Sequence, residues 1–417
     1  MTLLRRSSLP IVYLAVFVDL VGFGIILPIL PFYAEKFGAG GFWVGAILTA
    51  YSAAQFVSAL FLGRLSDRIG RRPILLVSLL GSALSLTATG LANSLVLLLL
   101  SRLIAGAFGG SITTAQAYVA DVTTPAERTK YLGLLGAAIG MGFVFGPAIG
   151  AGLSGFGFNT AAFVAAGLAA VNLLIALVAL PESRLPGRSR STQRSVRTVH
   201  LVAALHEQTL SAALLSTFFA TIAFVAMETT FALFGQERFG LDPARLGIVF
   251  ALVGIVVAVV QGGLIGRLHR RYDDRTLAGV GATLMAIAFA LIPVAPNLPA
   301  AIIALGGLAA GQGLVSPALS SLISQSSHGD SQGQALGLGQ SLSAGARAVG
   351  PLCAGWLFDR GVALPYLIAG LLMLAVVWLV SRVAIVNSGI EGQESGDSVY
   401  SYRGHPSREF PLPLEEG

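Results

Sequence analysis

The stretch GRLSDRIGRRP, residues 63–73, holds four arginines and one aspartate between two long apolar runs. A related stretch, IGRLHRRYDDR, occupies residues 265–275. Two further blocks recur: FYAEKFGAGGFWVGAILTAY (32–51) pairs with LFGQERFGLDPARLGIVFAL (233–252), and FVFGPAIGAG (143–152) pairs with RAVGPLCAGW (347–356). All three offsets fall between 201 and 204 residues, which indicates that the chain contains a duplicated unit.

The composition places this duplicated unit in a membrane. Hydrophobic residues make up 55% of the chain and charged residues only 11%, too few to cover the surface of a soluble protein of 417 residues. The apolar runs are about 20 residues long, enough to cross a bilayer as a helix. They are continuous, whereas the strands of a membrane barrel would alternate. We therefore expect an all-α polytopic membrane protein.

Twelve such runs can be counted, which predicts twelve transmembrane helices in two pseudo-symmetric six-helix halves. The expected spans are 10–32, 42–62, 73–92, 95–120, 131–154, 159–181, 209–234, 244–266, 276–295, 298–324, 333–357 and 363–385. Residues 1–181 and 209–386 form the halves. An arginine-rich linker (182–208) joins them, and a polar tail (387–417) follows that we expect to be disordered.

The basic residues predict how the chain is oriented in the membrane. Of the 26 Lys and Arg residues, twenty fall on the side of the N-terminus, four on the other side, and Arg102 and Arg347 within spans. By the positive-inside rule, both termini are expected to be cytoplasmic, in the inner (plasma) membrane of a cell. Topology thus accounts for the net charge of +6, and no nucleic-acid partner is expected.

Duplicated halves of this kind can rock about a central site and open it to each side in turn, which favours a transporter. Charged groups inside the spans are costly and usually functional. Asp19 with Arg102 is the first candidate for a proton switch, and Glu228 is a second carboxylate. A fixed Asp19–Arg102 pair that holds two helices together is the alternative. For Arg347, structural pairing and substrate contact both stay open.

Uncharged polar and small residues extend this set. Five glutamines within spans are weak candidates for a substrate cavity: Gln55, Gln116, Gln261, Gln312 and Gln340. Glycines spaced by four in the fifth span predict close helix packing, and the neighbouring proline predicts a bend, which would suit a sliding interface between the halves. The Gly-Pro pair recurs in the second half, so the expected packing and bending residues are Gly142, Gly146, Pro147, Gly150, Gly350 and Pro351.

Other classes of function fit less well. Cys353 is the single cysteine and the five histidines form no cluster, so neither a disulfide nor a metal site is expected. No catalytic constellation is present, which argues against an enzyme. A receptor or regulator that kept the fold without transport is a rival. No cofactor is expected beyond a proton gradient as energy source, and the partners expected are a small-molecule substrate, protons and lipid, with the protein as a monomer.

Four segments together carry a family resemblance. GRLSDRIGRRP (63–73), RLIAGAFGG (102–110), GFVFGPAIGAG (142–152) and PES (181–183) resemble signatures of the major facilitator superfamily. Within it, DLVGFGIILPILPFYAEKFG (19–38) looks most like the twelve-helix drug/proton antiporters, tetracycline efflux proteins included. The expected eighth and ninth spans lack the histidine and aspartate that tetracycline exporters carry there, so the resemblance does not extend to metal–tetracycline.

The resemblance implies proton-coupled export of small drug-like compounds by alternating access; the alternative is transport of a specific metabolite such as a sugar or organic acid. It also implies a gate at Gly63, Asp67, Arg68, Arg71 and Asp121, with the two arginines reaching Asp121 at the end of the fourth span. Topology explains the arginines of this loop but not its aspartate. Asp67 could meet the positive N-terminal end of a helix from the other half. Because Arg270 stands where the first half has Asp67, the gate should be asymmetric.

Overall fold

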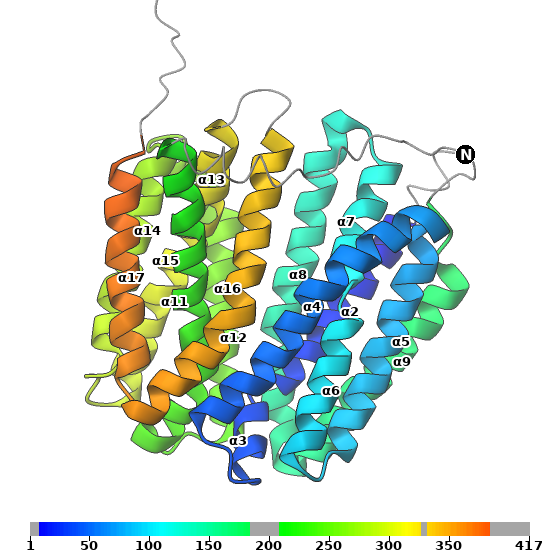
Figure 1. Ribbon diagram of the computed structural model, residues 1–417, viewed down its shortest axis with the longest axis horizontal. Helices are drawn as coiled ribbons and strands as arrows, with labels where there is room; N and C mark the ends of the chain where they lie inside the picture. The colour runs from blue at the N-terminus through cyan, green and yellow to red at the C-terminus, as the bar shows by residue number, and fades with distance from the viewer. Residues whose placement is uncertain (1–7, 184–207, 327–331, 384–417) are drawn as a thin grey trace, which may run out of the picture. The chain divides into compact units, whose positions relative to one another are not determined.

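A computed structural model describes residues 8–183, 208–326 and 332–383, and within these ranges the chain is α-helical. The tail predicted at 387–417, and all but the first two residues and the last of the linker predicted at 182–208, lie outside the described residues. In Figure 1 the helices coloured from blue through cyan to bluish green, α2 to α9, belong to the first half, and the green-to-orange helices, α11 to α17, belong to the second.

The first half is built from α2 (Leu9–Ile26), α3 (Leu30–Glu35), α4 (Gly41–Ile69), α5 (Arg71–Leu91), α6 (Leu95–Ala107), α7 (Ser111–Val122), α8 (Pro125–Leu153) and α9 (Phe158–Ala179). The second half is built from α11 (Gln208–Phe239), α12 (Pro243–Val259), the π-helical turn η2 (Val260–Leu264), α13 (Ile265–Leu268), α14 (Asp274–Leu291), α15 (Leu298–Gln325), α16 (Gln332–Arg360) and α17 (Leu364–Ser381).

Eleven segments among the described residues are long and apolar enough to cross a membrane. The remaining expected span, 333–357, corresponds to α16, whose 29 residues equal the length of α4 and α8 but are less apolar on average. The chain thus has twelve transmembrane helices in two pseudo-symmetric halves, and this prediction is confirmed. The fourth span is divided into α6 and α7 around Gly109 and Gly110.

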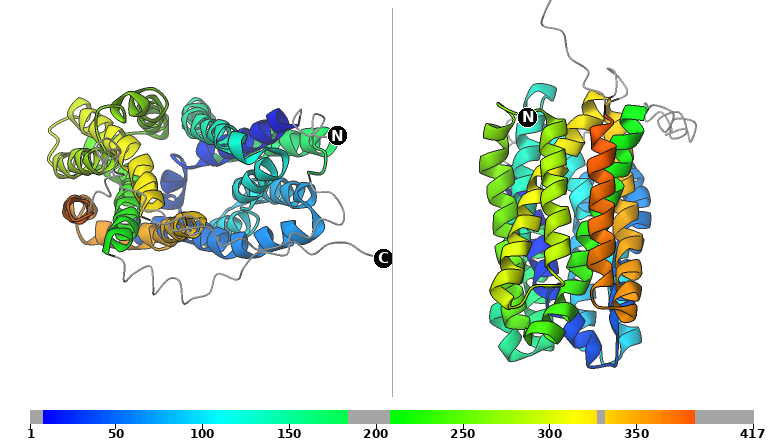
Figure 2. Two further views of the ribbon diagram at one scale, coloured as in Figure 1. Left: turned by 90° about the horizontal axis from the view of Figure 1, so that it is seen from above. Right: turned by 90° about the vertical axis from the view of Figure 1, so that its left-hand side faces the viewer.

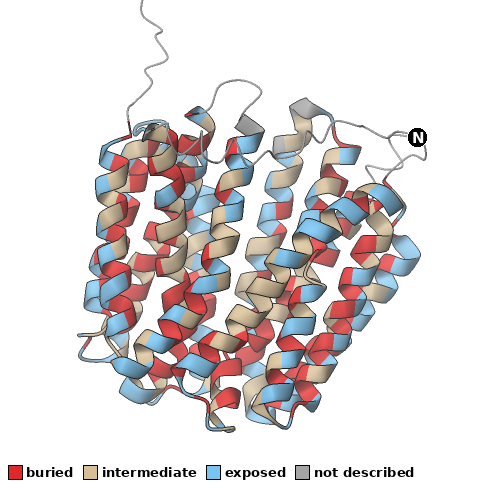
Figure 3. Cartoon of the chain, in the orientation of Figure 1, coloured by how far each residue is buried: buried red, intermediate tan, exposed pale blue. Residues whose placement is uncertain are grey.

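Each half has its own apolar core, and each presents apolar side chains outward. One cluster of buried residues lies mainly among α11, α12, α14, α15 and α17, a second lies mainly in the first half but includes Leu233 of α11, and a third lies within the first half. Large hydrophobic residues such as Val178 and Ile303 are strongly exposed, and exposed residues follow the outer helix faces in Figure 3. In a bilayer these faces meet lipid, so their exposure is expected.

The halves meet at the end of the helices where α4 and α12 begin and α8 and α16 end; Figure 2 shows the bundle from above and from one side. A side chain at Gly45 would overlap the backbone of Pro351, and a Cβ at Gly247 would lie 2.6 Å from the carbonyl oxygen of Pro147. These glycines therefore allow backbone-to-backbone contact between the halves. The two contacts are related by the sequence repeat, because Gly45 and Gly247 are 202 residues apart and Pro147 and Pro351 are 204 apart, both within the range of the repeat offsets.

Candidate substrate and coupling site

A central cavity of about 290 Å³ lies between the halves. Its wall from the first half is α8, and its wall from the second half comes from α11, α12, α15 and α16. Most of the lining is apolar, including Phe143, Phe224, Met227 and Phe250, and the polar members are Glu228, Gln261, Gln312, Ser316 and Arg347. Gln261 sits in the π-helical turn η2, a local deformation that often marks functional positions.

Glu228 and Arg347 form a loose pair on the wall of this cavity. The carboxylate oxygen Oε2 of Glu228 lies 4.0 Å from Nη1 of Arg347, at the outer limit of an ion pair. The Glu228 side chain is 19% exposed and that of Arg347 is 50% exposed, so the guanidinium keeps much of its surface free to meet a ligand. The sequence marked both residues separately, and the structure brings them together from α11 and α16.

Asp19 lies in a second, smaller cavity of about 30 Å³ inside the first half. Its two carboxylate oxygens accept hydrogen bonds of 2.6 Å from Ser82 on α5 and from Ser111 on α7. Tyr51 and Gln55 of α4 line the same cavity.

Arg102 on α6 lines the Asp19 cavity as well, but its Nη2 donates to Thr89 and its Nε has no hydrogen-bond partner among the described residues. In this conformation serines hold the carboxylate and a threonine holds the guanidinium. The proton switch that the sequence suggested therefore requires Asp19 and Arg102 to approach each other in another conformation, and it stays a prediction.

The charged stretch 63–73 spans the junction of α4 and α5, far from the contact between the halves. Arg71 Nη2 lies 2.7 Å from Asp67, and Arg71 Nε lies 2.9 Å from Asp121 at the end of α7. The Arg71 side chain is only 11% exposed, so it is a nearly buried bridge between two acids. Arg68, which the resemblance also directed at Asp121, is exposed, and Gly63 has open space around it.

Helix N-termini in this protein are met by carboxylates other than Asp67. Glu182 accepts hydrogen bonds from the backbone N–H groups of Arg71 (2.9 Å) and Arg72 (3.1 Å), and it so caps α5. Asp359 of α16 accepts from the N–H groups of Gly41 (2.7 Å) and Phe42 (2.8 Å), and it caps α4 from the opposite half. Sequence reasoning missed both acids, although Glu182 stands inside the PES segment.

The junction in the second half is different, as expected. Asp274 at the start of α14 lies 3.0 Å from His269 Nδ1 and accepts hydrogen bonds from Ser321 (2.5 Å) and Gln325 (2.7 Å) of α15. One feature is shared: Arg72 donates to the carbonyl of Leu177, and Arg275 donates to the carbonyl of Ser381.

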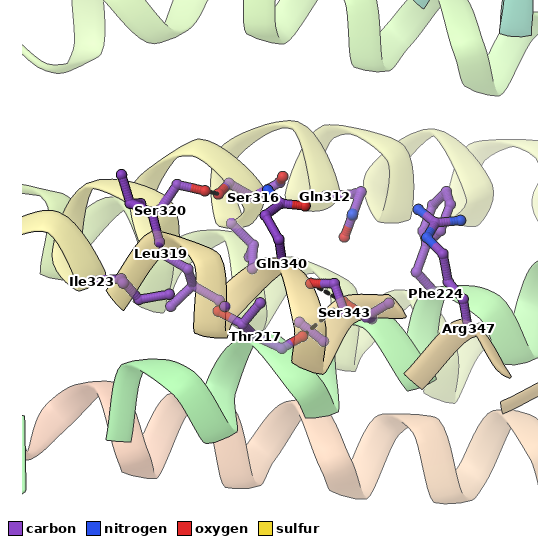
Figure 4. A pocket seen from close by; sticks show the side chains of 15 residues that line it. Thr217, Phe224, Gln312, Ser316, Leu319, Ser320, Ile323, Gln340, Ser343 and Arg347 are labelled. Atoms are coloured by element: carbon purple, nitrogen blue, oxygen red, sulfur yellow. Dashed lines mark hydrogen bonds between the residues drawn. The ribbon is translucent and has the colours of Figure 1, made fainter. Parts of the chain in front are cut away.

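The remaining glutamines proposed for a substrate cavity lie in different surroundings. Gln55 donates to Tyr51 and to the carbonyl of Gly109 beside Asp19. Gln340 lines a third cavity inside the second half, shown in Figure 4. Gln116 is exposed on α7.

Three of the candidate glycines lie on α8 and pack against their own half. Gly142, Gly146 and Gly150 pack against α2, and Gly350 lies beside Val225 of α11. The contact of α8 with the other half is made by Gly247 and Gly254 of α12, which approach Pro147 and Val144 of α8.

Comparisons with known proteins agree with this architecture. A model of the Major Facilitator Superfamily matches residues 12–351 and 262–407. The chain is 28% identical over 404 residues to the tetracycline resistance protein, class B, of Escherichia coli, which covers 94% of this chain and all of that protein. It is 29% identical over 382 residues to multidrug resistance protein 2 of Bacillus subtilis, which covers 87% of this chain and 93% of that protein.

Among solved structures, the crystal structure of the human organic anion transporter MFSD10 is similar, with a TM-score of 0.68 and 27% sequence identity. The match covers 90% of this chain and 99% of that chain.

Proposed function

Because this chain belongs to the Major Facilitator Superfamily, and is thus a multi-pass secondary transporter of a small molecule rather than an enzyme, we propose that it exports small drug-like compounds in exchange for protons. The observation that carries the proposal is the Glu228–Arg347 pair on the wall of an otherwise apolar cavity between the halves. An apolar compound with one polar group fits such a lining.

The pair supplies a physical reason for coupling. Ionised Glu228 attracts Arg347, whereas a protonated Glu228 releases it to a ligand or to another partner, so proton and substrate occupancy influence each other through one guanidinium. Asp19, within reach of the serines of α5 and α7, is the second proton-binding group, with Arg102 in the same cavity. Coupling through Asp19, Arg102 and Glu228 is thus part of the proposal.

The proposed orientation makes the end of the bundle at residues 63–73 cytoplasmic, together with both termini, in the plasma membrane. The cavity residues Gly136, Ile139 and Gly140 precede Pro147 along α8, and Ala151, which contacts Gly247, follows it. The contact between the halves thus lies on the outer side of the cavity. We interpret the structure as the state that loads substrate from the cytoplasm, with residues 1–181 and 209–386 as the two units that rock in a monomer.

The test is proton-linked transport by the purified protein in lipid vesicles. Under an imposed pH gradient, apolar aromatic drugs of the kind handled by multidrug exporters should accumulate, and their addition should cause proton flux. Glu228→Gln should remove the proton flux while substrate still binds. Drug transport at the same rate with and without the gradient would contradict the proposal, and so would full coupling in the Glu228→Gln variant.

A second candidate function is export of organic anions. The half-exposed, positively charged side chain of Arg347 could bind such a substrate. The similar human structure is that of an organic anion transporter. Carboxylated and neutral forms of one aromatic compound, compared in the same vesicles, decide between the two. Preference for the carboxylate that disappears in Arg347→Gln would favour the anion exporter.

A further inference from the structure

The third cavity lies inside the second half and has a volume of about 180 Å³. Polar residues line it at helical spacings on three helices: Thr217 and Thr221 on α11; Gln312, Ser316 and Ser320 on α15; Gln340, Ser343 and Arg347 on α16. Figure 4 shows Arg347 and Phe224 at one end of this polar pocket and Ser320 and Ile323 at the other. A water needs only about 10–15 Å³ of such space, so the pocket can hold a chemical group of several polar atoms.

The polar pocket borders the central cavity. Phe224, Gln312, Ser316 and Arg347 line both. A ligand in the central cavity can therefore extend past Arg347 into the polar pocket, so that its apolar part contacts the aromatic lining while its polar part enters the second half.

The pocket offers hydrogen-bond acceptors. A hydroxyl has one hydrogen to donate and two lone pairs to accept with. Thr217 donates its hydrogen to the carbonyl of Ala213 (2.9 Å), and Ser320 donates to the carbonyl of Ser316 (3.0 Å), which leaves their lone pairs for a ligand. Gln312 Oε1, also an acceptor, is buried without a hydrogen-bond partner among the described residues. A buried group of this kind is costly until something donates to it.

The charged residues of the lining restrict which chemical class of ligand the polar pocket can bind. The residues that line the polar pocket include one cation, Arg347, and no carboxylate; Glu228 lines only the central cavity. An ammonium group would meet Arg347 with no acid beside it in the pocket. A carboxylate could accept from the amide N–H groups of Gln312 and Gln340, but it has no hydrogen to donate to Gln312 Oε1 or to the lone pairs of Thr217 and Ser320. An uncharged group with several O–H donors matches both conditions.

We propose that the polar pocket binds the uncharged, hydroxyl-rich end of an amphipathic substrate whose ring system occupies the central cavity, as in an aryl glycoside. The proposal rests on the proposed function, because it takes the central cavity as the transport site. It adds a substrate class and assigns specificity to Gln340, Ser320 and Thr217.

Binding to the purified full chain tests the proposal, with three probes built on one ring system: the aryl β-glucoside, the cyclohexyl ether of the same size, and the β-glucuronide, which adds a carboxylate. Phenyl, naphthyl and coumarin rings are used in turn. The glucoside should bind at least about tenfold more tightly than the other two probes, which is the scale of one or two well-made hydrogen bonds. Equal or tighter binding of the ether or the glucuronide overturns the proposal, and so does the failure of every glucoside to bind.

Variants locate the site. Gln340→Leu and Ser320→Ala should weaken glucoside binding about tenfold and leave the ether unchanged. Unchanged ether binding also shows that the variants fold. Ser341→Ala is the matched control, because Ser341 is exposed on the same helix and does not line the pocket. An equal loss for glucoside and ether, or no loss for either, assigns the pocket no role in recognition.

Transport in vesicles separates the two proposals. Selective glucoside binding without proton-linked transport would refute the proposed function and leave the polar pocket as a binding site. Proton-linked transport of apolar drugs by a protein that does not prefer the glucoside would support the proposed function and refute the proposal for the polar pocket.

Discussion

Gly45 packs directly against the carbonyl group of Pro351, so closely that no side chain could stand at position 45. The matching contact, Gly247 against Pro147, lies at the same closed end of the bundle. Packing of this kind needs no charge and no long side chain, only the absence of a Cβ. It follows that closure of this end depends on glycines at the contact, Gly45 and Gly247 among them.

Gly45→Val and Gly247→Val should open the contact between the halves. Overpacking a tight contact costs typically about 1–3 kcal/mol, which shifts a two-state equilibrium about fivefold to 150-fold. With Cys353 replaced by serine, spin labels at positions 36 and 360 should report a longer distance in both variants, and transport should fall.

Gly167→Val is the control for this pair of variants, since Gly167 has open space around it within α9. An unchanged label distance in Gly45→Val would show that the contact accommodates the larger side chain. The contact would then not determine the balance between the open and closed states.

Asp359→Asn should also favour the open state of this end. The carboxylate caps α4 through Gly41 and Phe42, and loss of a helix cap costs about 0.5–2 kcal/mol. Because Asn keeps the shape of the side chain, the expected opening is smaller than for Gly45→Val. Asp242→Asn is the matched control, because Asp242 caps α12 within its own half through Arg245. An equal effect of both substitutions on the label distance would contradict a role specific to the contact between halves.

Asp67→Asn and Asp121→Asn should each impair transport without impairing membrane insertion. Arg71 bridges both acids, so removal of either charge leaves a nearly buried guanidinium with one partner fewer. Both carboxylates are about one-third exposed, so solvent screening keeps the loss of stability small and the effect appears in the transport rate. Transport rate per inserted protein is the measurement. Arg64→Gln, an exposed change in the same stretch, is the control, and normal transport by Asp67→Asn would make the stretch an ordinary loop.

Asp19→Asn should abolish uphill export and keep downhill exchange of substrate. An amide can still accept from Ser82 or Ser111, so the cavity should keep its shape while the proton site is lost. Counterflow and pH-driven accumulation, measured in the same vesicles, separate the two activities. Uphill export that survives the substitution would transfer the coupling role to Glu228.

The helices could be predicted from the sequence because apolar runs and a constant repeat offset report length and number directly. The sequence also shows that the fourth span ends near Asp121. The structure contains the contact of Arg71 with Asp121 that the family resemblance implies. The span 333–357 shows the limit of composition as a guide, since its helix α16 is long but carries the polar stripe of Gln340, Ser343 and Arg347.

The partners inside the site could not be predicted, because they depend on helix rotation. Glu228 and Arg347 are 119 residues apart, and nothing local relates them. Asp19 faces two serines rather than an arginine, and serines are too frequent in the spans for one to stand out. Gln116 and Gln261 look alike in sequence, yet only Gln261 lines the central cavity.

The paired contacts Gly45–Pro351 and Pro147–Gly247 have the pattern of an isologous interface, in which each partner gives the other the same two residues. A six-helix ancestor could have closed as a homodimer through this same patch before the two copies were fused. The cavity does not share that symmetry. The position that matches Arg347 in the first half is Phe143, and both side chains line the central cavity. The contact that closes this end is therefore present in both copies of the repeat, whereas at this position of the cavity wall only the second copy carries a positive charge.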